Sequence, residues 1–146
     1  MLHTFKANAK KTPIGLEVST TARDFEIRLD EPKSLGGSDK GMNPVEAMLS
    51  ALGACEVITA AAFAKSQNFT FEDCWVELEG DLDFAGFKGS KHVRNGFQEI
   101  RFKMHFKTDE SQERCEEFTR FVESRCPVFD NLTNGVDVVC SGVVKD

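Results

Sequence analysis

Two of the five cysteines stand where thiol chemistry could take place. Cys55 lies in a run with helical spacing, directly before Glu56, and Cys126 directly precedes Pro127. A cysteine reacts as its thiolate, so a functional role requires a positive neighbour or a second cysteine nearby. The alternative for Cys55 is a small apolar filler, because free cysteine is among the most buried residue types. The residues alone leave both interpretations open.

Cys126 is predicted to lie at the end of a helix. Pro127 disfavours the α conformation at the preceding residue, so the helix should end at Cys126 and leave it in a reachable loop. The C-terminal end of a helix is the negative end of its dipole, which disfavours a thiolate. Cys126 is therefore a poorer attacking thiol and a better resolving one. Arg125 beside it is interpreted as a solvated charge.

The remaining cysteines, Cys74, Cys115 and Cys140, each fall within a periodic segment and are interpreted as structural. No pair of cysteines has the C-x-x-C spacing of a zinc ribbon, and the three histidines are scattered. An odd number of cysteines does not suggest a disulfide framework. We expect no metal site and no bound cofactor.

Glu46 is the carboxylate that could act as a base or orient an arginine. It follows Asn43 by three residues, with Pro44 between them, which is the pattern of a capping box at a helix start. Capping is the preferred interpretation. The glycine-rich stretch 36–41 matches neither a P-loop nor a dinucleotide-binding motif, so we interpret it as a turn.

The first third of the chain is predicted to be mainly β-structure. Alternation of apolar and polar residues predicts three strands: Phe5–Ala7, Leu16–Val18 and Phe25–Leu29. A loop over 31–41 follows, and then a helix from Asn43 to about Gln67. Its apolar stripe is predicted to make it a central, largely buried helix, and small residues beside the stripe should allow close packing. That stripe consists of Met48, Leu49, Leu52, Cys55 and Ile58, and the small residues are Ala51, Gly53 and Ala54.

In the second half of the chain, strands are again followed by a helix. One strand is predicted around Trp75–Leu78 and another over Ile100–Phe106, with Trp75 in the core and a turn region over 86–96 between them. A helix capped by Thr108 or Asp109 should run through Glu123, with its inner stripe at Cys115, Phe118, Phe121 and Val122. A final strand is predicted over Val136–Val144. This order indicates an α+β fold rather than a Rossmann domain.

Composition narrows the classes of function. The chain has 146 residues and a net charge of −6, so we expect one domain over 1–146 that binds neither nucleic acid nor an anionic membrane surface. The apolar run 47–64 is interrupted by polar residues and is interpreted as a buried helix rather than a membrane span. The N-terminal residues lack the apolar region of a secretion signal. We therefore expect a cytoplasmic protein.

The combination of motifs resembles the OsmC/Ohr family. The resemblance rests on 41–46 (GMNPVE) followed by 51–55 (ALGAC), on 125–128 (RCPV), on the loop 32–37 and on the tail 134–138. It covers essentially the whole chain. It implies an OsmC-like fold with antiparallel sheets and two central helices, an intertwined homodimer, and active sites at the dimer interface.

The resemblance also implies an activity. Members of the family are known as thiol peroxidases that reduce organic hydroperoxides in the response to oxidative stress. Cys55 matches the peroxidatic cysteine and Cys126 the resolving one. A thiolate at Cys55 would become a sulfenic acid and condense with Cys126 to a disulfide. An external dithiol of lipoyl type or similar would then reduce that disulfide.

This sequence departs from the hydroperoxide-resistance branch at the activating groups. Val45 stands where that branch has a glutamate that holds an arginine near the thiolate, and Glu46 comes one residue later, about 100° around a helix. The nearest cations upstream are Lys10, Lys11, Arg23 and Arg28. Three hypotheses follow. The first is a peroxidase, the second a protein that holds a hydrophobic small molecule at the dimer interface, and the third a structural dimer.

Overall fold

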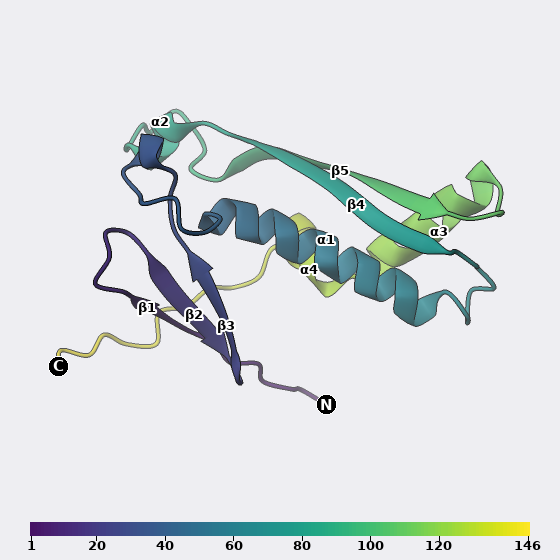
Figure 1. Ribbon diagram of the computed structural model, residues 1–146, viewed down its shortest axis with the longest axis horizontal. Coiled ribbons are helices and arrows are strands. Elements are labelled where there is room, and N and C mark those ends of the chain that lie inside the picture. Colours follow the sequence, from purple (N-terminus) through teal and green to yellow (C-terminus); the bar gives the residue numbers. More distant parts are fainter. The chain divides into compact units, whose positions relative to one another are not determined.

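The computed structural model describes all residues from 1 to 146. The backbone forms two compact units, residues 1–50 and 51–146. Each unit contains an antiparallel sheet. Along the chain, helices lie between the two sheets, between the two strands of the second sheet, and after it (Figure 1). The predicted α+β class with antiparallel sheets is thereby confirmed.

The N-terminal unit contains a three-stranded sheet in the order β1-β2-β3. These strands are β1 (Asn8–Lys11), β2 (Val18–Ala22) and β3 (Phe25–Leu29). Strands β2 and β3 form a hairpin in which Ala22 pairs with Phe25. Arg23 adopts a left-handed conformation in the turn, with φ of 54°, and its guanidinium lies over the Phe25 ring. A positive φ in a two-residue turn fits the twist of the flanking strands.

Two of the three predicted N-terminal strands are misplaced. The segment Phe5–Ala7 is not a strand, because β1 begins at Asn8, and β2 begins only at Val18. Alternation over three residues was too short to fix these positions. The bounds of β3 are confirmed, and its apolar residues face solvent in this chain. Phe25 and Ile27 are 63% and 60% exposed.

The loop after β3 is organised around Asp30. This carboxylate is 2% exposed and accepts hydrogen bonds from the backbone N–H groups of Glu31, Ser38 and Lys40. These bonds hold the pKa of Asp30 below its ordinary value. Because the loop amides point at a carboxylate of the chain itself, the interpretation of 36–41 as a turn is confirmed. The loop also contains the short helix η1 (Lys33–Leu35).

Helix α1 (Pro44–Phe63) starts as predicted. The Asn43 side chain accepts from the Glu46 N–H at 2.9 Å, and the Glu46 carboxylate accepts from the Asn43 N–H at 3.0 Å. This reciprocal pair is a capping box. The helix ends at Phe63, earlier than the predicted Gln67, and the chain turns at Asn68 with φ of 50°.

Burial of α1 is lower than predicted. Only Leu52, Gly53, Glu56, Thr59 and Ala60 are buried, whereas Met48 and Ile58 of the predicted stripe are 43% and 67% exposed. By length and apolar composition this one helix would suffice to cross a membrane. The core helix of a globular protein has the same character. A Cβ on Gly53 would come within 2.6 Å of Leu78 Cδ1, so the predicted close packing beside this glycine is confirmed.

A long antiparallel hairpin dominates the C-terminal unit (Figure 1). It consists of β4 (Asp73–Leu82) and β5 (Phe97–Lys107), joined through the short helix α2 (Phe84–Phe87). Arg101 on its exposed face binds Asp81 through two hydrogen bonds of 2.7 and 3.0 Å. Trp75 was predicted to be a core residue, which is wrong. It is 46% exposed and stacks on the His105 ring at 4.8 Å.

The core of this unit is built from phenylalanine. Phe69 and Phe118 stack with 4.2 Å between ring centroids, and Phe106 packs edge-on against Phe69 at 5.1 Å. Phe69 and Phe118 are each 2% exposed, and Val122 is fully buried. These contacts join β5 to α3 (Gln112–Arg125). The predicted inner stripe of this helix is confirmed, since Cys115 and Phe121 also pack against the core.

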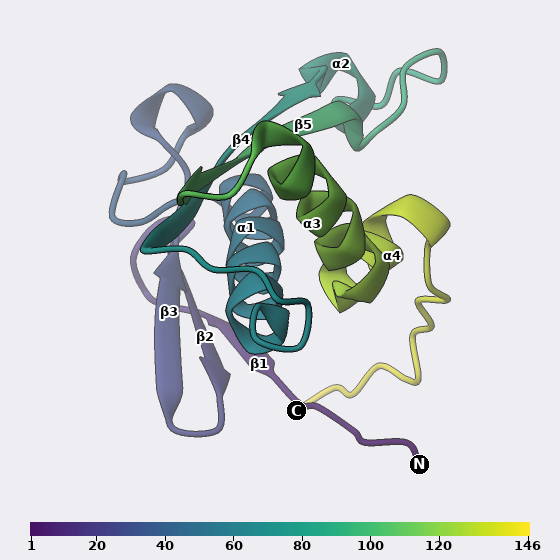
Figure 2. The ribbon, with the colours of Figure 1, turned by 90° about the vertical axis from the view of Figure 1, so that its right-hand side faces the viewer.

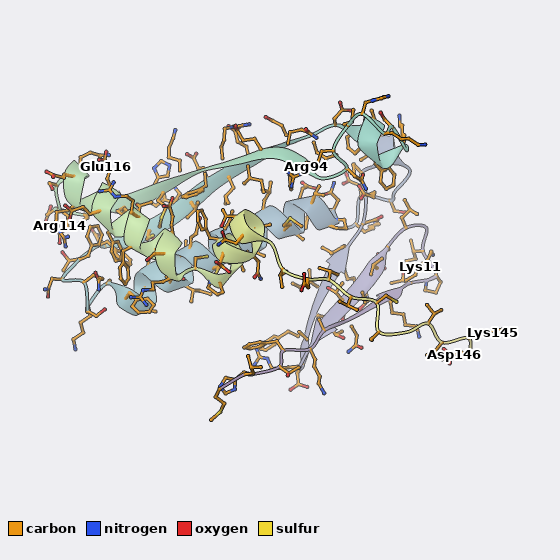
Figure 3. All side chains as sticks on the ribbon, turned by 180° about the vertical axis from the view of Figure 1, so that it is seen from behind. Lys11, Arg94, Arg114, Glu116, Lys145 and Asp146 are labelled. Atoms are coloured by element: carbon orange, nitrogen blue, oxygen red, sulfur yellow. The ribbon has the colours of Figure 1, made fainter.

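The ends of α3 differ in part from prediction. Ser111 is the N-cap, rather than Thr108 or Asp109, because its hydroxyl accepts from the Arg114 N–H. Arg114, labelled on α3 in Figure 3, also donates to the backbone carbonyls of Gln67 and Asn68. The helix extends to Arg125 and ends there as Pro127 requires.

The chain after α3 does not form the predicted final strand. Pro127 begins a further helix, α4 (Pro127–Asn134), which the sequence analysis missed. Residues 135–146 contain no strand and are exposed. Val138 is 92% exposed and Val143 is 92% exposed. The alternating valines have no strand beside them in this chain to supply backbone hydrogen bonds.

Candidate functional site

Cys55 lies about three turns into α1, on the border between its buried and exposed sides. The residue is half-buried, and its thiol is free. Its backbone carbonyl accepts a hydrogen bond from the Thr59 hydroxyl at 2.7 Å. Cys55 is therefore held on a rigid helix, with part of its surface open to a reactant.

Cys126 occupies the junction between α3 and α4. It is the C-cap of α3 and the N-cap of α4, with an extended backbone between the two helices. Its sulfur accepts a hydrogen bond from the Phe129 N–H at 3.4 Å. The residue is only 1% exposed, so the prediction of a reachable loop cysteine is wrong. The junction is a tight corner, because α4 begins immediately.

The fold brings the two thiols together. The Cys55 thiol is a hydrogen-bond neighbour of Cys126, although the two residues come from different helices. Burial raises the pKa of Cys126 to about 11, and the hydrogen bond with Cys55 contributes in the same direction. The hydrogen bond from the Phe129 N–H lowers the pKa of Cys126, but the effect of burial is larger. Cys126 is thus held as a neutral thiol beside a more exposed one.

Proximity of two thiols is the first requirement for a disulfide. A disulfide needs its two sulfur atoms to approach to about 2 Å, with Cα atoms about 4.4–6.8 Å apart. Cys55 and Cys126 are neighbours, so rotation of their side chains can bring the two sulfur atoms together. Of the two, the half-buried Cys55 is open to a reactant, and the buried Cys126 can reach only its neighbour.

Three other candidate groups are engaged elsewhere. One oxygen of Glu46 is used in the capping box. Arg28 binds the buried carboxylate of Glu17 at 3.2 Å and that of Glu26 at 3.1 Å. Arg125 is exposed and lies over the Phe121 ring at 5.3 Å, which agrees with its interpretation as a solvated charge.

The sequence analysis missed Glu56 as a functional residue. Its side chain is fully buried, and neither carboxylate oxygen has a hydrogen-bond partner. Burial raises its pKa to about 7, and the charge of Glu123 on α3 adds to this effect. The signal was present in the sequence, since a glutamate directly after Cys55 interrupts an apolar run. Such a carboxyl group titrates near neutral pH, where most glutamates are fully ionised.

The other cysteines lie outside this pair. Cys74 and Cys115 are half-buried and pack against the phenylalanine core, and burial raises the pKa of both. Their interpretation as structural agrees with this packing. Cys140 lies exposed in the C-terminal segment, so its assignment to a structural strand is wrong.

Comparison with known proteins identifies the class to which this fold and thiol pair belong. The model of the OsmC-like protein family matches residues 37–141, and the chain belongs to this family. That match spans the capping box, both cysteines and the long hairpin.

Individual relatives agree with this assignment. The chain is 28% identical over 116 residues to a hydroperoxide reductase of Mycoplasma genitalium, covering 79% of this chain and 77% of that protein. It is 31% identical over 109 residues to a hydroperoxide reductase of Mycoplasma pneumoniae, covering 74% and 72%. The crystal structure of an OsmC-like protein from Mycoplasma pneumoniae superposes with a TM-score of 0.79 at 26% identity. It covers 90% of this chain and 89% of that one.

Proposed function

We propose that this protein is a thiol peroxidase that reduces organic hydroperoxides. The observation that carries the proposal is the contact between the half-buried Cys55 thiol and the buried Cys126 thiol. The names of the two mycoplasma relatives, both hydroperoxide reductases, support the same reaction. Cys55 is the peroxidatic residue and Cys126 the resolving residue.

The reaction proceeds in two chemical steps. The Cys55 thiolate attacks the terminal oxygen of the hydroperoxide, the O–O bond breaks, and the alkoxide takes up a proton and leaves as an alcohol. Cys55 is then a sulfenic acid. The sulfur of Cys126 attacks the Cys55 sulfur, water leaves, and a Cys55–Cys126 disulfide remains. An external dithiol, of lipoyl type or similar, restores both thiols by exchange.

The division of labour between the thiols follows from their surroundings. A hydroperoxide must reach the attacking sulfur, and Cys55 is the more exposed of the two. Cys126 is sealed from solvent, which protects it from direct attack and over-oxidation. Glu46 is engaged in capping, which favours a structural role for it over a catalytic one.

We propose that the protein acts in the cytoplasm as an intertwined homodimer. Apolar side chains exposed in each unit support association with a second copy, since monomeric proteins rarely leave large apolar patches uncovered. Phe25 and Ile27 on β3 are exposed, as are Ile58 on α1 and the valines of the C-terminal segment. Sedimentation equilibrium of the purified protein should give twice the mass of 16.3 kDa.

The test of the proposed activity compares cysteine variants with cumene hydroperoxide and a dithiol reductant. Cys55→Ser should lose turnover, and Cys126→Ser should stop after one equivalent with Cys55 as the sulfenic acid. Cys115→Ser, which alters a thiol outside the pair, should retain turnover. Equal turnover in Cys55→Ser and the unaltered protein would overturn the proposal.

A second candidate function is the binding of a hydrophobic small molecule. A groove of about 700 Å³ lies between β5 and α3, with Phe102, Met104 and Cys115 among its lining residues. Val45 in place of the expected glutamate also favours this alternative. Native mass spectrometry of the purified protein distinguishes the two functions. A retained small molecule, together with slow reaction with hydroperoxide, would favour binding.

A further inference from the structure

Glu56 occupies a buried position that the reaction described above leaves unused. A carboxylate shielded from water and without hydrogen bonds is costly, so a fold that retains one calls for an explanation. Glu56 is fully buried, and both of its oxygens lack partners. Its helix neighbour is Cys55, and consecutive Cα atoms are about 3.8 Å apart.

Contacts between α1 and α3 locate Glu56 relative to the thiols. Cys55 meets Cys126, Glu56 interacts with Glu123, and Phe63 packs edge-on against Phe121 at 5.4 Å. Residues later in α1 are paired with residues earlier in α3, so the two helices run antiparallel through this interface. Figure 2 shows them side by side. Glu56 thus lies between the thiol pair and the aromatic pair.

The position of Glu123 strengthens this placement. Residues three apart on a helix share a face and lie about 5–6 Å apart. Glu123 precedes Cys126 by three residues, so the carboxylate that faces Glu56 is on the same side of α3 as the resolving thiol. Glu56 therefore faces the side of α3 that also carries Cys126.

Strand β4 and helix α4 also lie near this interface. Strand β4 presents Leu78 to α1 beside Gly53, and its charged residues alternate onto the opposite face. On α4, Asp130 accepts a hydrogen bond from the Asn134 side chain. The ionisable groups on α1 and α3 at this interface are the carboxyls of Glu56 and Glu123 and the thiols of Cys55 and Cys126, and the Arg125 guanidinium lies nearby over the Phe121 ring at 5.3 Å.

The resolving step requires the Cys126 thiol to lose its proton. Cys126 must lose its proton before its sulfur can attack Cys55, and it is sealed from bulk water. Burial holds the pKa of this thiol near 11, so very little thiolate exists at neutral pH. A nearby base with a pKa near neutrality is the group that general base catalysis requires.

We propose that Glu56 accepts the proton of Cys126, directly or through one water molecule, in the step that closes the Cys55–Cys126 disulfide. This inference rests on the proposed peroxidase function, because that function supplies the sulfenic acid at Cys55. The Cys126 proton passes to Glu56, and the thiolate attacks the Cys55 sulfur while the S–O bond breaks. The departing hydroxide takes the proton back from Glu56 and leaves as water, so the carboxylate is regenerated.

The test uses a disulfide reagent in place of a hydroperoxide. Full-length protein in which Cys74, Cys115 and Cys140 are alanine is reduced and mixed with one equivalent of 5,5′-dithiobis(2-nitrobenzoic acid). Cys55 releases a first thionitrobenzoate, and attack by Cys126 on the mixed disulfide releases a second, which absorbance reports. The rate of the second release is measured from pH 5 to 9.

The expected profile rises through about pH 7, where Glu56 ionises, and then levels off. Glu56→Gln should abolish this rise and slow the second release at pH 8 by at least about tenfold. Glu56→Asp should restore the rise. Glu123→Gln, which leaves the base in place, should retain the rise and move it to lower pH.

Three results would overturn the proposal: an unchanged profile in Glu56→Gln, a faster second release in that variant, or no second release in the parent. A faster release would mean that the negative charge of Glu56 only disfavours the Cys126 thiolate by electrostatic repulsion. Because no hydroperoxide is used, a protein without peroxidase activity can still pass or fail this test. The proposed function and the role of Glu56 are thus tested separately.

Discussion

Replacing Glu56 by glutamine should change how the stability of the folded protein depends on pH. The carboxyl group has an ordinary pKa of 4.5, and burial raises it to about 7 in the folded chain. Between these pH values the folded state keeps a proton that the unfolded state has lost. The free energy of unfolding therefore falls as the pH rises through this interval, and the penalty is complete above about pH 7.

The size of the effect follows from the two pKa values. At about 1.4 kcal/mol for each pH unit, the interval from 4.5 to about 7 corresponds to about 3 kcal/mol. Water that enters the folded interior would reduce this figure, so it is an upper value. Glutamine cannot ionise, so Glu56→Gln should match the unaltered protein near pH 4.5 and exceed it in stability at pH 8.

The assay is urea unfolding followed by circular dichroism at pH 5, 6, 7 and 8, with protein concentration and ionic strength held constant. The difference between the two proteins isolates Glu56, because the other titrating groups are common to both. Glu116→Gln is the control, since Glu116 is exposed on α3 (Figure 3), and should show no such divergence with pH. A difference that does not change between pH 5 and 8 would refute the reasoning and indicate a compensating partner for the Glu56 charge.

Three further predictions concern the fold that positions the site. Phe118→Ala should lower the free energy of unfolding by about 3–5 kcal/mol in urea titrations, because it empties the centre of the aromatic core; a loss below 1 kcal/mol would contradict this. Gly53→Leu should cost about 1–3 kcal/mol through collision with Leu78, whereas Gly53→Ala should be nearly neutral, since helix propensity offsets a small movement of that side chain. Asp30→Ala should speed hydrogen exchange at the Ser38 and Lys40 amides, because it removes the acceptor of their hydrogen bonds. Acidification of the unaltered protein should have the same effect. The pKa of Asp30 is lowered in the folded chain, so its stabilisation of the loop is present at neutral pH and lost as the pH falls. Exchange that is equally slow in Asp30→Ala would show that the carboxylate does not hold the loop.

Elements with strong local signals in the sequence were predicted correctly. The capping box at Asn43 and Glu46 fixed the start of α1 because both hydrogen bonds are local. Pro127 fixed the end of α3 for a similar reason. The five-residue alternation of β3 was long enough to place that strand, whereas the three-residue pattern at Phe5–Ala7 was not.

Errors arose where burial depends on contacts distant in sequence. Trp75 was assigned to the core because of its type, but its position in β4 places it on the exposed face of the hairpin. Cys126 was expected to be reachable because proline ends helices, but α4 begins at once and Cys126 is only 1% exposed. Apolar periodicity in α1 predicted a buried helix, yet Ile58 lies on a side that nothing in its own chain covers.

The candidate site was predictable only in part. Cys55 and Cys126 were paired through the family resemblance. Their residue types and spacing alone did not predict that they lie next to each other. The buried carboxyl of Glu56 became visible only once α3 was placed against α1. A charge within an apolar run marks such a position, but its protonation depends on the tertiary neighbours.

The central claim is that Cys55 and Cys126 form a reactive pair, and direct mapping of the cysteines after oxidation tests it. The reduced protein is treated with one equivalent of an organic hydroperoxide, quenched by alkylation, digested and examined by mass spectrometry. A Cys55–Cys126 disulfide formed within seconds, with Cys74, Cys115 and Cys140 still alkylated as thiols, is the predicted result. An unoxidised Cys55, or oxidation spread equally over all five cysteines, would contradict the account.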